Sequence, residues 1–448
     1  MRESHRHAAI VLTLLVFALL ALPGPPDLPA LPGRPGLAVL SAAQIPFEQA
    51  AADLVSADPA TRLRAVQTLR RAAYPEAAVP LAALVTDAQD DIQLEAIAAE
   101  LNIFLAERVV TRKRIALVVE VRNAVHAEPA FTAGPNALGP RPVPTEVLTA
   151  LRTAMRDENP RVALEALYAF GVLAVEPGGN ARRDLLRASG PDVAAFIGSS
   201  DAALRYAAVR VLGRVFAKRA QDEPIESTVG DAAITALNDN ERAVKAAAMH
   251  ALGAMRYDRG VQALSDLFAY YGKGDAADAA LDALAHIGHS TSVPLFTAQL
   301  SGKTPSLRGI AMEGLARAGA VSQIAAIQAV LDKERNPNVA LAAAFALVML
   351  GSAPTDRVAD WLSKPKLREQ AKPYLIEIAP GRTTMFAHQL LDSDPQIRLD
   401  IVDVLGLAGD PAAIASVEPL MTDRDPQVAR AAERAVARLR QVAAKPVS

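Results

Sequence analysis

The 448-residue chain contains no cysteine, which excludes disulfide bonds, thiol catalysis and lipid attachment through an N-terminal cysteine. Its formal net charge is only −2. This argues against nucleic-acid binding, because a long surface that binds nucleic acid needs a basic face to neutralise phosphates. Apolar residues make up 51% of the chain and aromatic residues only 4%, so we expect a core of Ala, Leu and Val. No segment shows the alternation typical of a β-strand.

Residues 1–43 form a leader that differs from the rest of the chain. Arg2 and Arg6 precede an uncharged apolar stretch, Ala8–Leu22, which is typical of an export signal and short for a membrane span. A proline-rich stretch follows, and small-residue cleavage sites occur after Ala21 and at Ser41–Ala43. The sequence predicts export to the periplasm or cell envelope. The leader would engage the membrane during export and then be either cleaved or retained as an anchor.

Beyond the leader, the chain repeats a short motif with a period of about 31 residues, which indicates stacked supersecondary units. The motif is Asp or Asn, then Pro, then any residue, then an apolar anchor, as in Asp425–Val428. The acidic or amide side chain predicts a helix N-cap, and the proline suits the first helical position. Asp or Asn stands three residues before six of the eleven anchors that this register gives. The anchors are Thr61, Ile92, Val162, Leu204, Val244, Ala276, Leu307, Val339, Leu367, Ile397 and Val428.

Each motif predicts one capped helix with a buried stripe. Ala recurs four residues after the anchor and Leu eight after it, as at Ala343 and Leu347, and these offsets share one helical face. A second amphipathic helix precedes the capped one, for example over 77–84, 292–300, 324–331 and 414–421. Pro80, Pro294 and Pro419 lie inside three of these segments and are predicted to kink them.

The helix pairs, the Asp-Pro turn and a basic residue directly after the anchor (Arg62, Arg205, Lys245, Arg308, Arg368 and Arg398) together resemble the HEAT repeat. The short period is most similar to the bacterial variety of the phycobilin lyase subfamily, over roughly residues 50–440. The resemblance implies an all-α, right-handed solenoid of about eleven helical hairpins, of armadillo/HEAT type. It also implies that the capped helices line a concave face and that the turn Asp and the following Arg form a ladder between repeats. It implies a fold and no particular activity.

The predicted organisation is a leader at 1–43, repeats at 44–106, an irregular unit at 107–156, repeats at 157–441 and a tail at 442–448. The irregular unit begins with a basic helix over 107–124 that includes Arg112 and Arg114, followed by a Pro/Gly-rich loop over 126–144 with Phe131. The helix is either a solvated face or a docking patch for an acidic partner. The loop is either a tolerated insertion or a functional element, since loops of this length are uncommon in compact arrays.

Catalytic motifs are absent from the sequence. It contains no Gly-x-Ser-x-Gly and no His-Glu-x-x-His, and no histidine is followed by Glu, which excludes the His-Glu iron site of HEAT-like deoxyhypusine hydroxylases. Six residues after the anchor, successive capped helices carry Arg210, His250, Asp282 and Glu313, and His286 lies one turn beyond Asp282. Stacking should align these residues on the concave face.

This row has two interpretations. Asp282 and His286 with His250 or Glu313 have the residue types of a divalent metal site. Neighbouring helices are ~10 Å apart, however, which favours a ladder of alternating charges. We therefore predict no metal, no cofactor and no catalysis.

The sequence predicts an exported scaffold that binds a protein partner on its concave surface or inserted loop. The alternative is a lyase-type enzyme or enzyme subunit that uses the polar row; the export signal argues against action on cytosolic pigment proteins. The candidate partner-binding residues are Arg210, His250, Asp282, His286, Glu313, Arg112, Arg114 and Phe131.

Overall fold

The computed structural model of the protein describes residues 47–105, 126–134, 138–139, 141–174, 180–217 and 224–444. The chain divides into two units, Met1–Ile45 and Pro46–Ser448, and all described residues belong to the second. The predicted leader and the predicted basic helix over 107–124, with Arg112 and Arg114, lie outside the described residues. Within the described part, no helix has the length and apolar character needed to span a membrane.

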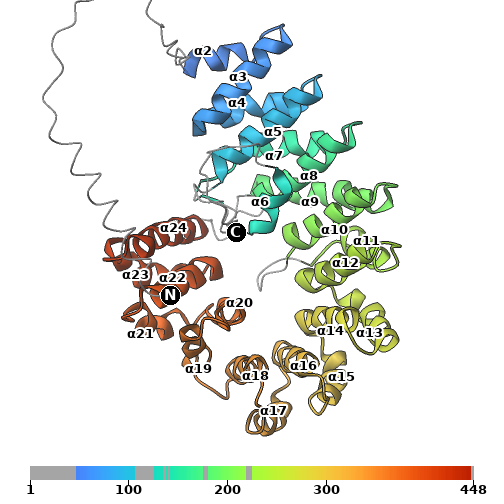
Figure 1. Cartoon of the computed structure of the whole chain (residues 1–448), viewed down its shortest axis with the longest axis vertical. Helices are drawn as coiled ribbons and strands as arrows, with labels where there is room; N and C mark the ends of the chain where they lie inside the picture. Colours follow the sequence, from blue (N-terminus) through green and yellow to red (C-terminus); the bar gives the residue numbers. More distant parts are fainter. Residues whose placement is uncertain are drawn as a thin grey trace, which may run out of the picture. The chain divides into compact units, whose positions relative to one another are not determined.

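The described residues are helical and contain no β-strand; their one extended contact is an isolated bridge between Leu105 and Leu138. Helices occur in pairs, and we call the second helix of each pair the B helix and the preceding one the A helix. Each predicted anchor lies at the start of one B helix, and consecutive B helices pack side by side (Figure 1). The B helices are α3 (Pro59–Ala72), α5 (Asp90–Phe104), α8 (Pro160–Leu173), α10 (Ala202–Val215), α12 (Arg242–Met255), α14 (Asp275–Ile287), α16 (Pro305–Arg317), α18 (Pro337–Met349), α20 (Arg368–Ile378), α22 (Pro395–Ala408) and α24 (Pro426–Ala443).

Each B helix packs against the A helix that precedes it, which completes the helical-hairpin repeat. Several A helices are short and are extended by 3₁₀ turns. The predicted helix over 324–331 is confirmed as α17. The A helices are α2 (Phe47–Asp53), α4 (Ala78–Ala82), α7 (Thr145–Ala154), α9 (Asn180–Ala195), α11 (Ser227–Ala236), α13 (Val261–Tyr271), α15 (Val293–Gln299), α17 (Ile324–Leu331), α19 (Asp356–Ala359), α21 (Ala387–Leu390) and α23 (Ile414–Val417).

The kinks predicted at Pro80 and Pro294 are wrong. Both prolines lie in the first turn of their helices, α4 and α15, where the missing amide has no partner inside the helix. Pro419 does interrupt its segment: α23 ends at Val417, and a 3₁₀ turn over Glu418–Thr422 follows. At the C-terminus, α24 continues to Ala443, into the segment predicted as a tail.

The predicted caps and core positions are confirmed. The Asp58, Asn159 and Asp425 side chains accept backbone N–H groups of the helices that they precede, which satisfies amides that have no partner inside the helix. In α18, Ala343 is fully buried and Leu347 is 2% exposed. The core is therefore a continuous layer of small and branched apolar side chains between A and B helices.

A ladder of ion pairs connects successive repeats, but its acid differs from the predicted one. The Arg205 guanidinium lies 2.7 Å from the Asp239 carboxylate, and Asp239 also accepts the amide of Glu241, two residues further on. This acid lies five residues before the next anchor, whereas an acid three before an anchor, such as Asp201 or Asp425, caps its own helix. The same pairing joins Arg62 to Asp87, Arg308 to Glu334 and Arg398 to Asp423.

Candidate functional site

A row of polar and aromatic side chains runs along the B helices. Residues six and ten after each anchor lie one helical turn apart. Some of their side chains meet across neighbouring B helices, as Arg210 meets Tyr168 and Arg317 meets Phe345. We call this surface the B-helix face. Its members include Tyr168 on α8, Arg210 and Arg214 on α10, His250 on α12, Asp282 and His286 on α14, Glu313 and Arg317 on α16, Phe345 on α18 and Glu377 on α20.

A closed ion network occupies the part of this face between α16 and α20. The Arg317 side chain, only 5% exposed, donates from Nε and Nη2 to both carboxylate oxygens of Glu377, at 2.9 and 2.8 Å. Its Nη1 donates to Glu313 at 3.1 Å, and the Tyr374 hydroxyl donates to the other oxygen of Glu313. Phe345 stacks on Tyr374 with ring centroids 4.4 Å apart.

The pKa shifts in this network follow from burial and from Arg317. Burial raises the pKa of the Glu313 carboxyl, although Arg317 opposes the shift. Burial acts in the same direction on Glu377, but the two bonds from Arg317 outweigh it and hold the pKa of that carboxyl below its usual value. Burial also raises the pKa of Tyr374, which therefore remains a hydrogen-bond donor. Each charged group thus has a partner inside the network.

The middle of the B-helix face is more open. His250 is exposed on α12, and the Asp282 and His286 side chains are each 37% exposed on α14. The His286 Nδ1 atom lies 3.4 Å from the Asp282 carboxylate. Burial opposes the charged imidazole, yet Asp282 raises the pKa of His286 above its usual value. Although the His250 side chain is accessible, the surrounding protein partly desolvates its imidazole, and this desolvation, with the nearby charges of His286 and Arg210, lowers the pKa of His250.

The two-residue contact between Asp282 and His286 is not extended by Glu313, whose oxygens face Arg317 and Tyr374. Among the residues that the structure describes, no group of three or more His, Asp or Glu side chains is placed to hold a metal ion. In this part of the row, the contact described above joins Asp282 and His286 within α14.

The inserted segment contains a helix where the sequence predicted a loop over 126–144. Helix α6 (Ala127–Ala133) packs against α8. Pro129 is tolerated because it lies in the first turn of α6. The N-terminus of α6 is capped by a distant residue: Glu165 on α8 accepts the Ala127 amide at 2.8 Å and lies 3.0 Å from His126 Nδ1. Residues 138, 139 and 141–144 are not helical.

Phe131, a predicted partner-binding residue, is buried beneath this helix and is only 5% exposed. Its ring fits because Gly171 on α8 has no side chain: a Cβ atom there would lie 2.8 Å from the ring. The Arg214 guanidinium lies over the ring, 4.0 Å from its centroid. Phe131 is therefore engaged within the chain and is not presented to solvent.

Arg210 connects α6 to the B-helix face. Its guanidinium donates to Glu128 at 3.0 Å, to Thr132 at 3.1 Å and to the Tyr168 hydroxyl at 3.2 Å. It also lies within cation–π distance of Phe131, Tyr168 and Tyr206. Burial, with the nearby charge of Arg210, lowers the pKa of Arg214 to about 10. The polar row and the insertion, which the sequence predicted as two separate candidate sites, thus meet at Arg210.

We call the surface that receives α6 the α6 socket. The sequence indicated Arg210 in the socket and Phe131 in the helix that the socket receives, but none of the other socket residues. The available signal was an acidic residue and an aromatic residue three apart, Glu128 and Phe131, after a segment that departs from the repeat. The socket consists of Glu165, Tyr168, Gly171, Arg210, Val211 and Arg214.

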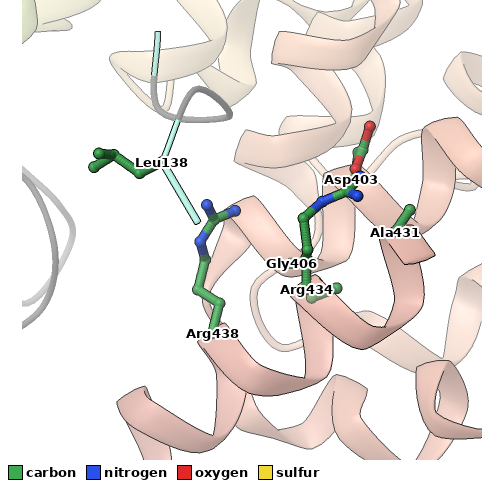
Figure 2. A pocket seen from close by; sticks show the side chains of 7 residues that line it. Leu138, Asp403, Gly406, Ala431, Arg434 and Arg438 are labelled. Carbon is green, nitrogen blue, oxygen red and sulfur yellow. The ribbon is translucent and has the colours of Figure 1, made fainter. Parts of the chain in front are cut away.

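Two hollows lie elsewhere in the described part. Leu138 lies beside α22 and α24 and lines a cavity of about 10 Å³ with Asp403, Arg434 and Arg438 (Figure 2); this volume holds at most one water molecule. An open groove of about 540 Å³ between α4 and α7 is lined mainly by Ala and Thr, and Glu146 is its one charged residue. The first hollow is too small for a substrate, and the second has a single charged residue, so neither has the features expected of an active site.

The chain matches no protein-family model. No curated protein matches it either. Among solved structures it is similar to an engineered protein (18% identity, 88% of this chain and 98% of that chain, TM-score 0.43). It is also similar to the CpcE–CpcF complex of phycocyanin lyase from Nostoc (22%, 56% and 94%, TM-score 0.34). A designed armadillo repeat protein bound to the peptide (KR)4 is similar too (16%, 60% and 98%, TM-score 0.36).

These similarities are too low for any transfer of function. The fold itself follows from the paired helices and their stacking, in the order and at the positions that the repeat predicted. The chain is an all-α solenoid of HEAT/armadillo-type helical hairpins.

Proposed function

We propose that this protein is an exported scaffold that binds another protein along its B-helix face and has no catalytic activity of its own. The observation that carries the proposal is α6. This face already holds one helical segment, through a cap from Glu165, a clamp from Arg210 and a pocket for Phe131. A surface that holds such a segment has the anchors that protein recognition uses, namely an aromatic pocket and a buried Arg.

The open middle of the face offers the contact area for a partner. His250, Asp282 and His286 are accessible, and they lie next to the α6 socket on consecutive B helices. Stacked repeats hold such side chains at fixed spacing on a long surface, which suits an extended partner. The mixed charges of the row favour a polar protein surface over nucleic acid.

The titratable groups favour a scaffold over a lyase-type enzyme. Strongly shifted pKa values mark candidate active sites. On the B-helix face, shifts occur at Tyr168 and Arg214, whose side chains contact α6, and at Glu313, Arg317 and Tyr374 between α16 and α20. The last three groups bond to one another and to Glu377. They form a closed network with no titratable group directed at a hollow.

Site-specific photocrosslinking tests the proposal. The full chain would be produced with p-benzoylphenylalanine in place of His250, on the B-helix face, or of Asp266, which is exposed on the A helix α13. We expect a discrete protein adduct from the envelope at position 250 and none at position 266. No adduct at position 250, or equal adducts at both positions, would contradict binding on this face.

A further inference from the structure

We infer that the α6 socket is a docking site for a short helix of the partner protein, and that α6 competes for it as an internal ligand. The partner helix would carry an acidic residue in its first turn and an aromatic residue three positions later. This inference rests on the proposed function and adds to it the chemistry of the partner and a means of regulation.

The first support is that α6 is not a layer of the solenoid. Helix α5 packs directly against α8, although their anchors are separated by the whole insertion. The stack of B helices therefore continues without α6, which lies on α8 in addition to that stack. Its position is that of a ligand bound to the repeat surface.

The second support is the set of complementary contacts in the socket. Glu165 receives the amide at the helix N-terminus, and Arg210 receives the carboxylate of Glu128 and the hydroxyl of Thr132. The space above Gly171 receives the Phe131 ring. Residues three and four apart lie on one face of a helix, so any helix with this spacing presents the same groups. The socket thus recognises an acidic and an aromatic residue three positions apart on a helix, and a helix of another chain can carry the same two residues.

The third support is that α6 has little stability of its own. It has seven residues, and isolated helices shorter than about 12–15 residues are marginal in water. Glu128 is 54% exposed, so its pair with Arg210 is partly solvated and adds little net stability. In contrast, the socket residues belong to α8 and α10, two regular B helices of 14 residues each that pack against one another in the stack. The helices that form the socket are therefore held by the repeat stack, whereas α6 depends on its contacts with the socket.

A peptide-binding measurement tests the socket directly. The probe is a fluorescein-labelled synthetic peptide with the sequence of residues 124–134, and the protein is the full chain as wild type or as Phe131→Ala, which removes the internal aromatic anchor. We expect fluorescence anisotropy to show at least tenfold tighter binding to Phe131→Ala than to wild type. The same peptide with Ala in place of its Phe should lose that binding.

Two further variants keep the measurement decisive. Glu128→Lys places a like charge beside Arg210 and should expose the socket without altering Phe131, so it should also bind the peptide at least tenfold more tightly than wild type. Arg210→Ala in the Phe131→Ala background should weaken binding at least tenfold. Equal affinity of wild type and both exposed-socket variants, or no effect of the Phe in the peptide, would overturn the inference.

The link to a partner is tested by crosslinking from Tyr206, which lies next to Arg210. With p-benzoylphenylalanine at 206, the yield of the partner adduct should rise severalfold in Phe131→Ala and fall when unlabelled peptide is in excess. An adduct at position 250 together with an unchanged yield at 206 would overturn the inference and leave the proposed function intact. Peptide binding without any adduct at 250 or 206 would instead overturn the proposed function.

Discussion

The Arg210 guanidinium on α10 donates to the Glu128 carboxylate on α6 at 3.0 Å, across 82 residues of sequence. This contact places a segment of the insertion on the surface that the repeat forms. Because of this contact, the surroundings of Arg210 and Glu128 differ from those that their sequence neighbours alone would give them. Arg210 is largely buried, and the helix that contains Glu128 exists through contacts with α8 and α10.

The fit of Phe131 against Gly171 predicts the effect of a single methyl group. Gly171→Ala places a Cβ atom 2.8 Å from both the Phe131 ring and Val211, so α6 should leave the socket. We expect faster cleavage within 127–133 in limited proteolysis. Gly198→Ala is the matched control, because a Cβ there meets nothing within 4 Å. Equal cleavage of both variants would contradict the described packing.

The α16–α20 network should respond non-additively to substitution. Arg317→Met leaves Glu313 and Glu377 without their buried cation and should cost roughly 3–5 kcal/mol in the free energy of unfolding. Glu377→Gln in the same chain should recover part of that loss, since one unpaired charge is removed. Urea denaturation of the two single variants and the double variant measures the coupling. Strict additivity would show that Arg317 and Glu377 do not interact.

The two histidines of the B-helix face should affect stability with opposite pH dependence. The pKa of His286 is raised, so its contribution is fully present below about 6.5 and is lost as the pH rises through its folded pKa. The pKa of His250 is lowered, so its contribution is present above about 6.5 and is lost as the pH falls through its folded pKa.

Melting temperatures at pH 5.5 and pH 8.5 would separate these effects. His286→Gln should lower the melting temperature more at pH 5.5 than at pH 8.5. The melting temperature of His250→Gln relative to that of wild type should be higher at pH 5.5 than at pH 8.5, because the variant has no imidazole whose protonation opposes folding. The same pH trend in both variants would contradict the environments described for these two side chains.

The core stripe gives a quantitative check on helix register. Leu347 lies between the helix layers, so Leu347→Ala should cost roughly 2–5 kcal/mol through the cavity it leaves. Ala343 is fully buried, and Ala343→Leu should cost roughly 1–3 kcal/mol through overpacking. Thermal melts that match wild type for both variants would refute the register of α18.

Export remains a prediction from residues 1–43. Fusing residues 1–50 to a reporter that is active only outside the inner membrane should give an active reporter, because a basic start precedes the apolar stretch Ala8–Leu22. A fusion without the leader is the control. A silent reporter that accumulates normally would disprove export.

The sequence predicted the repeat well because its signals are local. An N-cap, a first-turn proline and a stripe with helical spacing lie within about twelve residues of each other, and the structure places a B helix at every predicted anchor. The pairing of Asp239 with Arg205 could not be predicted at this level. The turn before Val428, for example, holds two acids, and only the three-dimensional path of the turn decides that Asp425 caps α24 while Asp423 pairs with Arg398.

The candidate site was only partly predictable for the same reason. Helix α6 is short, contains Pro129 and ends before Gly134, so a local pattern indicates a loop. Its helical state depends on Glu165 and Arg210, which are far away in sequence. The α16–α20 network was also predicted only in part. Pro373 occupies the position on α20 where the row predicts a polar side chain, and the network continues instead through Tyr374 and Glu377.

Because α6 is part of the same chain as the socket, it fixes the partner concentration that is needed to displace it. Because α6 is covalently attached, its effective concentration at the socket does not change with the abundance of the protein. A partner must then exceed a threshold concentration, and each tenfold preference of the socket for α6 raises that threshold about tenfold. Small substitutions in α6 would therefore change the partner concentration at which the scaffold binds, while the repeats that form the binding surface stay unchanged.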